Sequence, residues 1–436
     1  MRSATRRALA AATVVALLAA ACGDDADEAA DPAAEAEDPA SDADDTAGDD
    51  AADDDAAEEA DTASAAELDV DAVLAAGTDC EPPEGDPLVI GYAADLSDVG
   101  GYADQPGSEA AAFMADLINC AGGLDGTPVE VVVQDIQGDP DVTQRAAQDL
   151  LDAGVHAILG PPFSDFGLPL LQVVDGQVPV VFVASTEALL PDPDRSSYLM
   201  AFDDRAQATA AAMFAADQVG AQTAVTLSSS DDLYFEQVPQ MFGEAFEAAG
   251  GQLVQDFSYS LADSDFSSQV NQIAALDEEP DVIYTSMIMP MVGTLIGQLR
   301  AAGVESDILG ADSFDATGVI AAGEDADGVY YTTHGFPGEG SRMQAFLDAF
   351  ADDGGEFETV SFGALAGDAV LLVADAYLRA DGLDADAIAE QIGATENLEL
   401  ITESVSYAGT GGIPDKPVFI HRIEDGGITL ADTVTP

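Results

Sequence analysis

The chain has 436 residues, with 84 acidic and 11 basic side chains and a formal net charge of −73 at pH 7. This length exceeds what one ordinary core accommodates and suits two lobes. A surface this negative repels nucleic acid and anionic lipid, so we exclude both as binding partners.

Residues 1–21 have the composition of an export signal. Three arginines form a positive start, and the apolar run 8–20 that follows is too short to remain in a bilayer as a spanning helix. The signal ends in Leu18-Ala-Ala-Ala-Cys22, which resembles the bacterial lipobox, whose cysteine is lipidated on sulfur and becomes the new N-terminus. We therefore predict a lipid anchor at Cys22, and the alternative is an ordinary secretory signal with an incidental cysteine.

Residues 22–75 are predicted to form a disordered acidic tether. From Gly23 to Asp71 there are 22 Asp and Glu residues, no Lys or Arg, and no aromatic residue. Such a segment buries too little apolar area to offset the ordering of the chain, and its like charges extend it. We expect it to hold the folded part away from the membrane. Calcium binding is the weaker interpretation, since nothing imposes a coordination geometry.

Cys80 and Cys120 are the two cysteines that remain after Cys22. An exported protein lies where disulfides persist. Cys80 precedes the first predicted strand and Cys120 ends the first predicted helix, two places that can be close in a βα unit. We predict a disulfide between them, and two buried thiols are the alternative.

From Leu88 onward, short apolar strands alternate with helical stretches, the pattern of parallel sheets with helices on their faces. The first four predicted strands are 88–92, 129–133, 157–159 and 178–183, with helices at 107–120, 142–153 and 165–175. After residues 198–202 the pattern starts again, with helices at 206–219, 235–249, 266–276 and 292–302 and strands at 224–227, 252–257, 282–284 and 308–309. From Gly328 onward we predict one more strand, helices near 341–351 and 362–379, and β segments near 398–407 and 418–423.

Two successive units of this kind predict an α/β fold of two doubly wound parallel-sheet lobes joined by a hinge. The last part of the chain is too short for a third domain and is expected to recross between the lobes. The predicted lobes are therefore 86–203 with 335–408, and 204–334 with 409–436, with crossings near Asp203, His334 and 408–411. No apolar stretch after the signal is long enough to cross a membrane.

Six predicted loops follow the carboxyl ends of strands, where open α/β sheets bind their ligands. They span residues 95–102, 161–166, 184–187, 228–234, 287–291 and 312–315. Ser, Thr, Asp and Tyr are frequent in these loops, whereas the preceding strands are almost purely aliphatic. The contrast predicts a polar binding cleft. The alternative, that these residues cap the following helices, holds at the same time, because a helix N-terminus itself binds a carboxylate.

Enzyme motifs are absent from the sequence. No dinucleotide fingerprint, phosphate loop, nucleophile elbow or paired-histidine metal motif occurs in a fitting strand–loop–helix context. His156, His334 and His421 are scattered, and a lone histidine is usually structural. We therefore predict a binding protein that is not an enzyme and that needs no cofactor and no metal.

Several short stretches recur in a family-like order and spacing over about 290 residues. They are Ile90-Gly-Tyr-Ala-Ala-Asp-Leu-Ser97, Gly101-Tyr-Ala-Asp-Gln105, Asp116-Leu-Ile-Asn119, Ala121-Gly-Gly-Leu-Asp-Gly126, Ala157-Ile-Leu-Gly-Pro161, Asp265-Phe-Ser267, Asp281-Val-Ile-Tyr284 and Gln298-Leu-Arg-Ala-Ala-Gly303. With them, the segment from Leu88 to about Arg379 resembles the branched-chain amino-acid (Leu/Ile/Val) binding proteins. These are substrate-binding proteins of ABC transporters with the type I periplasmic-binding fold.

The resemblance implies a set of ligand contacts. The positions that match the family's contacts to the ligand's α-carboxylate are Ser164 and the run Ala184, Ser185 and Thr186. Asp312 matches the acid that faces the α-ammonium group, and Tyr102 and Tyr234 match cleft tyrosines of the first and second lobes. Hydroxyls and N–H groups for the anion, a carboxylate for the cation and aromatic rings for the hydrocarbon form a coherent set.

Some positions depart from the family. Asp165 puts a negative charge beside the carboxylate site, where the family usually has a hydroxyl, and an inward-pointing Asp165 would favour a neutral or cationic ligand. Ile288 and Gly367 stand where the family has tyrosines. The run Met287–Met291 around Ile288 indicates a larger or more apolar pocket, although methionines more often fill gaps in a core.

The resemblance therefore implies an extracytoplasmic, lipid-anchored, monomeric solute-binding protein of an ABC importer. It would capture an amino acid, branched-chain or related, between its lobes and deliver it to the permease and ATPase subunits. A binder of amides, urea or aromatic acids with the same fold stays open, as does a ligand sensor that reports to a membrane partner.

Overall fold

The computed structural model of the chain describes residues 68–97, 99–380 and 382–436. The predicted signal, Cys22 and most of the predicted tether lie outside the described residues, so the lipid anchor stays a prediction.

The first sheet has five parallel strands in the order β2-β1-β3-β4-β5. Its strands are β1 (Leu88–Ala94), β2 (Val129–Asp135), β3 (Ala157–Gly160), β4 (Val180–Phe182) and β5 (Ser197–Leu199), and its connecting helices are α2 (Gly101–Cys120), α3 (Pro140–Asp152) and α4 (Ser164–Val174).

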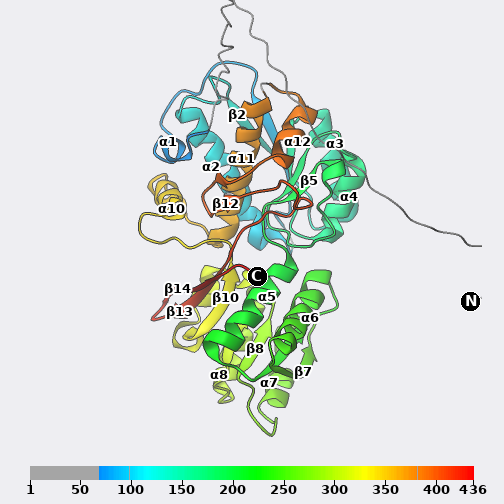
Figure 1. Ribbon diagram of the computed structural model, residues 1–436, viewed down its shortest axis with the longest axis vertical. Helices are drawn as coiled ribbons and strands as arrows, with labels where there is room; N and C mark the ends of the chain where they lie inside the picture. The colour runs from blue at the N-terminus through cyan, green and yellow to red at the C-terminus, as the bar shows by residue number, and fades with distance from the viewer. Residues whose placement is uncertain (1–67, 98, 381) are drawn as a thin grey trace, which may run out of the picture. The chain divides into compact units, whose positions relative to one another are not determined.

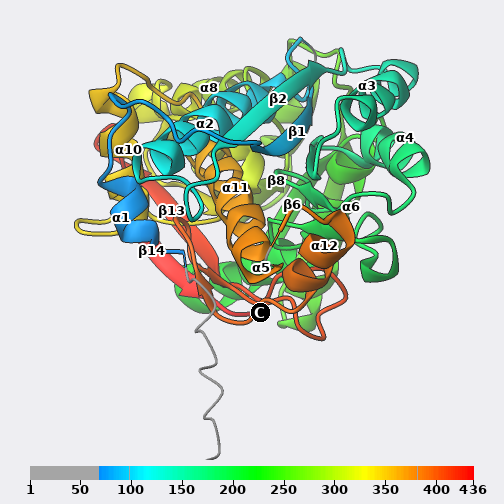
Figure 2. The ribbon, with the colours of Figure 1, turned by 90° about the horizontal axis from the view of Figure 1, so that it is seen from above.

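Both faces of the first sheet are buried, because neighbouring residues of a strand point to opposite faces. Ile158 of β3 packs in one core cluster with Leu150 of α3 and Leu170 of α4. The next residue, Leu159, packs in a second cluster with Met114 of α2. Figure 2 shows α2 on one side of β1 and β2 and α3 and α4 on the other.

The second sheet has seven strands in the order β14-β13-β10-β9-β8-β6-β7. Five are parallel: β6 (Thr223–Ser228), β7 (Gln252–Ser258), β8 (Val282–Thr285), β9 (Asp307–Gly310) and β10 (Val329–Thr333). The antiparallel hairpin of β13 (Val418–Glu424) and β14 (Gly427–Val434) completes the edge beside β10. Its helices are α5 (Asp204–Phe214), α6 (Leu233–Ala248), α7 (Ser267–Ile273), α8 (Met291–Ala301) and the short α9 (Thr317–Ile320).

The chain passes between the two sheets three times: after β5, after β10 and before β13. Between the last two passages lie α10 (Arg342–Asp352), α11 (Val360–Ala380), α12 (Ala385–Gly393) and the small pair β11 (Leu398–Glu399) and β12 (Ser404–Val405). We call the first sheet with α2, α3, α4, α10, α11 and α12 the first lobe, and the second sheet with α5 to α9 the second lobe. Figures 1 and 2 show α11 lying alongside α2.

The predicted fold class, two doubly wound α/β lobes, is confirmed. The residue limits that we assigned to the lobes stay a prediction. The structure does correct one expectation about membranes, because α11 is long and apolar enough to pass a composition test for a membrane span. The apolar stretch of α11 is 89% buried within the protein, so α11 is a core helix.

The prediction that the disordered tether extends to residue 75 is wrong. Residues 70–74 form helix α1 (Val70–Leu74), and Val70, Val73 and Leu74 are buried. Apolar side chains at this spacing lie on one side of a helical turn, so even a short acidic segment can dock. Asp71, on the same turn, pairs with the guanidinium group of Arg342 of α10 at 2.7 Å.

Besides α1, the sequence analysis did not predict the helices α9 and α12 or the strand β14. Asp425 and Gly426 join β13 to β14, and both have positive φ, 53° and 74°. An Asp-Gly pair of this kind is a strong hairpin signal, so β14 was readable.

Cys80 and Cys120 form a disulfide with a Cα–Cα distance of 5.5 Å. It joins the segment before β1 to the last residue of α2.

Candidate functional site

Each of the six loops predicted to carry the site follows the carboxyl end of a parallel strand. In the first lobe these strands are β1, β3 and β4, and in the second they are β6, β8 and β9. A seventh strand, β10, ends directly before His334.

Loops of the two lobes meet. The ring of Phe163, from the loop after β3, lies 6.4 Å from that of Tyr234 and 5.9 Å from that of Phe235, both on α6. Within the first lobe, the ring of Tyr102 packs edge-on against Phe362 of α11 at 5.5 Å, and the Thr359 hydroxyl donates to the backbone carbonyl of Tyr102. The backbone N–H of Thr317 in the second lobe donates to the Glu358 carbonyl. If one ligand binds in a crevice between the lobes, the contacts of Phe163 with α6 and of Thr317 with Glu358 must lie at the edge of that crevice or open when the ligand enters.

The expected carboxylate site at Ser164 is occupied by a carboxylate of the protein itself. Ser164 is the first residue of α4, and its backbone N–H and its hydroxyl both donate to Glu187, at 2.5 and 2.6 Å. Both residues are buried. Burial raises the pKa of the Glu187 carboxyl to about 7, and its two hydrogen bonds from Ser164 only partly oppose this.

The next expected donor, Thr186, is also used internally. Its hydroxyl donates to Asp204 at 2.5 Å, and the Asp204 N–H donates back to the Thr186 carbonyl at 2.8 Å. Burial raises the pKa of Asp204 well above its usual value, against the bond from Thr186. Ala184 is buried beside them, and Ser185 is buried with its hydroxyl lacking a hydrogen-bond partner among the described residues.

Asp312, the expected partner of an ammonium group, accepts two hydrogen bonds. The Tyr234 hydroxyl donates to its Oδ1 at 2.5 Å, and Nε2 of His334 lies 3.0 Å from its Oδ2. The Asp312 N–H donates to the side-chain oxygen of Gln207 at 3.2 Å. Each carboxylate oxygen has two acceptor positions, so Asp312 retains room for a further donor.

His334 is held in a defined state by this arrangement. Because a carboxylate only accepts, Nε2 carries the proton, which leaves a lone pair on Nδ1. Within the described chain, that buried Nδ1 has no partner. Burial lowers the pKa of the imidazole, against the opposing effect of Asp312, so the ring is neutral at neutral pH. Phe202 stacks on it at 4.0 Å.

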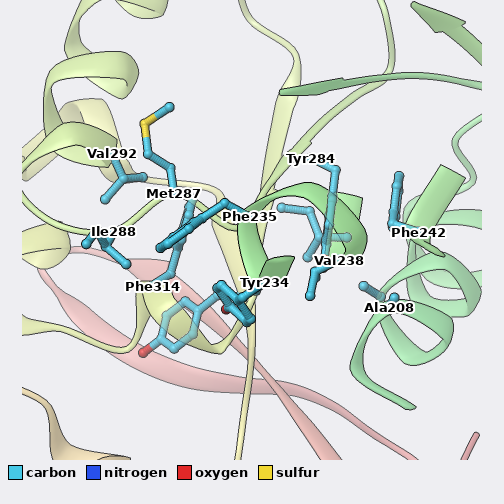
Figure 3. Packing of buried hydrophobic residues seen from close by; sticks show 14 of the residues in the cluster. Ala208, Tyr234, Phe235, Val238, Phe242, Tyr284, Met287, Ile288, Val292 and Phe314 are labelled. Atoms are coloured by element: carbon cyan, nitrogen blue, oxygen red, sulfur yellow. The ribbon is translucent and has the colours of Figure 1, made fainter. Parts of the chain in front are cut away.

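The positions that depart from the family have structural explanations. Asp165 is exposed, so it does not point into the buried network. A Cβ atom on Gly367 would lie 2.7 Å from Cδ1 of Ile401, which leaves no space for a tyrosine there. Met287 and Ile288 are buried in the core of the second lobe, and Figure 3 shows them close to Phe235. Core packing therefore accounts for Met287 and Ile288, and Met289 packs half-buried against the same core.

No ligand-binding role was predicted for Glu187, Asp204 or His334, and His334 was expected only to mark a crossing between the lobes. Glu187 ends one of the six predicted loops, and His334 follows a strand, so the strand-end rule reaches both. Asp204 lies in the first turn of α5 and had no local signal beyond helix capping. In the part of the chain that the structure describes, no group of three or more His, Cys, Asp or Glu side chains is placed to hold a metal ion.

A family model described as "Periplasmic binding protein" matches residues 87–427 of the chain. The chain belongs to this family. Members are extracytoplasmic solute-binding proteins of ABC transporters, and the resemblance identified from the sequence is confirmed.

Relatives carry several ligand names. A Leu/Ile/Val-binding protein of Rhizobium johnstonii, BraC3, is 26% identical over 352 residues, covering 79% of this chain and 94% of the relative. The leucine-binding protein LivK of Thermotoga maritima superposes with a TM-score of 0.72 at 25% identity, covering 80% and 99% of the two chains. A solute-binding protein of Rhodopseudomonas palustris in complex with 3,4-dihydroxy benzoic acid superposes with a TM-score of 0.71 at 20% identity, covering 80% and 98%. At that identity the last likeness shows the fold alone.

Proposed function

We propose that this protein is the binding component of an ABC importer for an amino acid, branched-chain or related, or for a similar small nitrogen compound. Asp312 supports the proposal most directly, because it is a buried carboxylate with Tyr234 and His334 around it, placed to accept an ammonium N–H. The name of the Rhizobium relative is consistent with this ligand class.

Capture would take place between the lobes, without covalent chemistry, a cofactor or a metal. A ligand would dock first on the strand-end loops of the first lobe, at Ser164, Ser185 and Thr186, and any group that accepts from Ser164 or Thr186 would have to displace Glu187 or Asp204. Closure would then bring Asp312 and Tyr234 to its other side. The closed form is favoured because it alone makes both sets of contacts.

Delivery would follow at the membrane. We propose that lipidated Cys22 anchors a monomer to the outer side of the cell membrane and that the acidic segment behind it acts as the tether. The closed form would then be recognised by the permease, with the ATPase subunits driving import.

Isothermal titration of the purified protein against amino acids, amides, urea and aromatic acids tests this proposal. Saturable binding of an amino acid or amine, lost on Asp312→Ala, is the expected result. Binding of aromatic acids alone would favour the alternative of an aromatic-acid binder with the same fold and would exclude Asp312 as an ammonium site. Mass spectrometry of whatever small molecule co-purifies provides an independent reading.

A further inference from the structure

The network where the lobes meet is rich in buried carboxylates. Glu187, Asp204 and Asp312 are each no more than 4% exposed. Asp232, the residue before α6, is partly buried, and burial raises the pKa of its carboxyl to about 6. Burying several ionised carboxylates together is costly, so they either take up protons, as the raised pKa values of Glu187 and Asp204 indicate, or are compensated by positive charge.

The protein itself supplies little of this compensation. In the described part of the chain, Arg195, Arg342, Arg379 and Arg422 pair with acidic residues outside this network. Arg300 bonds to backbone carbonyls near the end of α8, and Arg145 and Arg205 are exposed. Lys416, the only lysine, donates to the Thr402 hydroxyl and lies beside Asp368, and its charge also reaches His334, whose pKa it helps to lower. The only ion-pair partner of Asp312 among described residues is His334, which is neutral at neutral pH.

Aromatic rings surround the same place. Tyr102 and Phe362 form one pair, and Phe163 contacts Tyr234 and Phe235 from the opposite lobe. The face of an aromatic ring attracts a cation, and the attraction grows when both are removed from water. Carboxylates and ring faces together, without a neighbouring lysine or arginine pair, are the surroundings that an organic cation prefers.

Two buried polar atoms at the network have no hydrogen-bond partner among residues 68–97, 99–380 and 382–436. The first is the hydroxyl of Ser185, which directly precedes Thr186 and Glu187, the residues that bond to Asp204 and Ser164. The second is Nδ1 of His334, on the ring whose Nε2 contacts Asp312. Buried polar atoms are nearly always hydrogen-bonded, so exceptions call for a missing partner. Both atoms can accept a hydrogen bond from an ammonium group.

The donors expected to bind a ligand carboxylate are already used by the protein. The donors reserved for it at Ser164 are already held by Glu187, and the hydroxyl of Thr186 is held by Asp204. An incoming carboxylate would have to displace Glu187 into surroundings that already contain Asp204 and Asp232. A further negative charge there would add to the effect of Asp232, which already raises the pKa of the Glu187 carboxyl.

We propose that this site binds a small organic cation without a free carboxylate, such as an amine or an amino-acid amide, and that Glu187 determines this specificity. The inference rests on the proposed function and narrows its ligand class. Glu187 would fill the place that the α-carboxylate takes in an amino-acid complex, while the ammonium group binds Asp312, His334 and the surrounding rings.

Matched probes separate the two proposals. Isothermal titration at neutral pH would compare leucine, leucinamide, 3-methylbutylamine and 4-methylpentanoate, with a second set built on alanine for a smaller site. We expect the amine or the amide to bind at least roughly tenfold more tightly than the amino acid, a difference of about 1.4 kcal/mol, and the acid not to bind. Tighter binding of the amino acid would overturn the cation inference and leave the proposed function standing. Binding of the acid alone, or of no probe, would overturn both.

Variants of Glu187 test its role directly. Glu187→Ala frees the Ser164 donors and removes a charge, so it should reverse the preference towards the amino acid. Glu187→Gln keeps the shape of the side chain and should weaken amine binding roughly tenfold. This variant tests the role of Glu187 even if the alanine variant does not fold. Glu130→Ala, an exposed carboxylate at the opposite end of β2, is the matched control and should change nothing. An unchanged ratio of amine to amino-acid affinity in both Glu187 variants would refute the assignment.

Discussion

Replacing Glu187 by glutamine should make the stability of the protein less sensitive to pH. Burial raises the pKa of the Glu187 carboxyl from 4.5 to about 7. Below pH 4.5 the group is protonated in both the folded and the unfolded state. Between pH 4.5 and about 7 the unfolded chain releases the proton first, so the free energy of unfolding falls as pH rises. Above pH 7 the loss is complete and amounts to about 3 kcal/mol, because one pKa unit corresponds to about 1.4 kcal/mol.

Glutamine has nearly the same shape, keeps an acceptor oxygen for Ser164 and does not titrate. We therefore expect Glu187→Gln to gain stability relative to the wild type between about pH 5 and about pH 8, by up to about 3 kcal/mol. The other carboxylates whose charge acts on Glu187 or is acted on by it are present in both proteins, so the difference between the two proteins isolates the Glu187 carboxyl.

Urea unfolding of both proteins at several pH values between about 5 and 8 measures this difference. Glu130→Gln, on the exposed side of β2, is the control and should follow the wild type. A stability difference between Glu187→Gln and the wild type that stays constant over this pH range would show that burial does not control the Glu187 proton.

Three further variants test the lipid anchor, the disulfide and the ammonium site. Cys22→Ser should release the protein from membranes while leaving ligand affinity intact, and continued membrane retention would rule out the lipid anchor. Cys80→Ser should lower the free energy of unfolding by about 4 kcal/mol, from the entropy of the 40-residue separation between Cys80 and Cys120; an unchanged urea midpoint would contradict this. Asp312→Ala should weaken an ammonium ligand by roughly 1.5–3 kcal/mol, and an unaltered dissociation constant in titration calorimetry would remove Asp312 from the site.

Much of the candidate site could be predicted from the rule that open α/β sheets bind ligands at the carboxyl ends of their strands. It selected the loops that hold Ser164, Thr186 and Asp312, because the aliphatic strands before them were easy to recognise. It could not say that Ser164 and Thr186 already have partners. Glu187 is 23 residues from Ser164 along the chain, and their pairing depends on how the loop after β4 folds back over α4.

Signals that were present and overlooked differ from signals that were absent. The Asp425-Gly426 turn predicts the β13–β14 hairpin by itself, since it requires positive φ at two neighbouring residues. Helix α1 has apolar residues at helical spacing, but their burial depends on α2 and on α10, whose Arg342 pairs with Asp71 from 271 residues away. No local pattern contains that partner.

Local patterns in the sequence determined the alternation of strands and helices, the two-lobed α/β class and the strand ends that carry polar side chains. These features depend on interactions between residues close in the chain, which periodicity and turn residues record. The occupant of the Ser164 donors, the neutral state of His334 and the shortage of compensating positive charge were decided only by the tertiary structure. Each depends on burial and on carboxylates brought together from distant segments, and burial is a property of the packed fold.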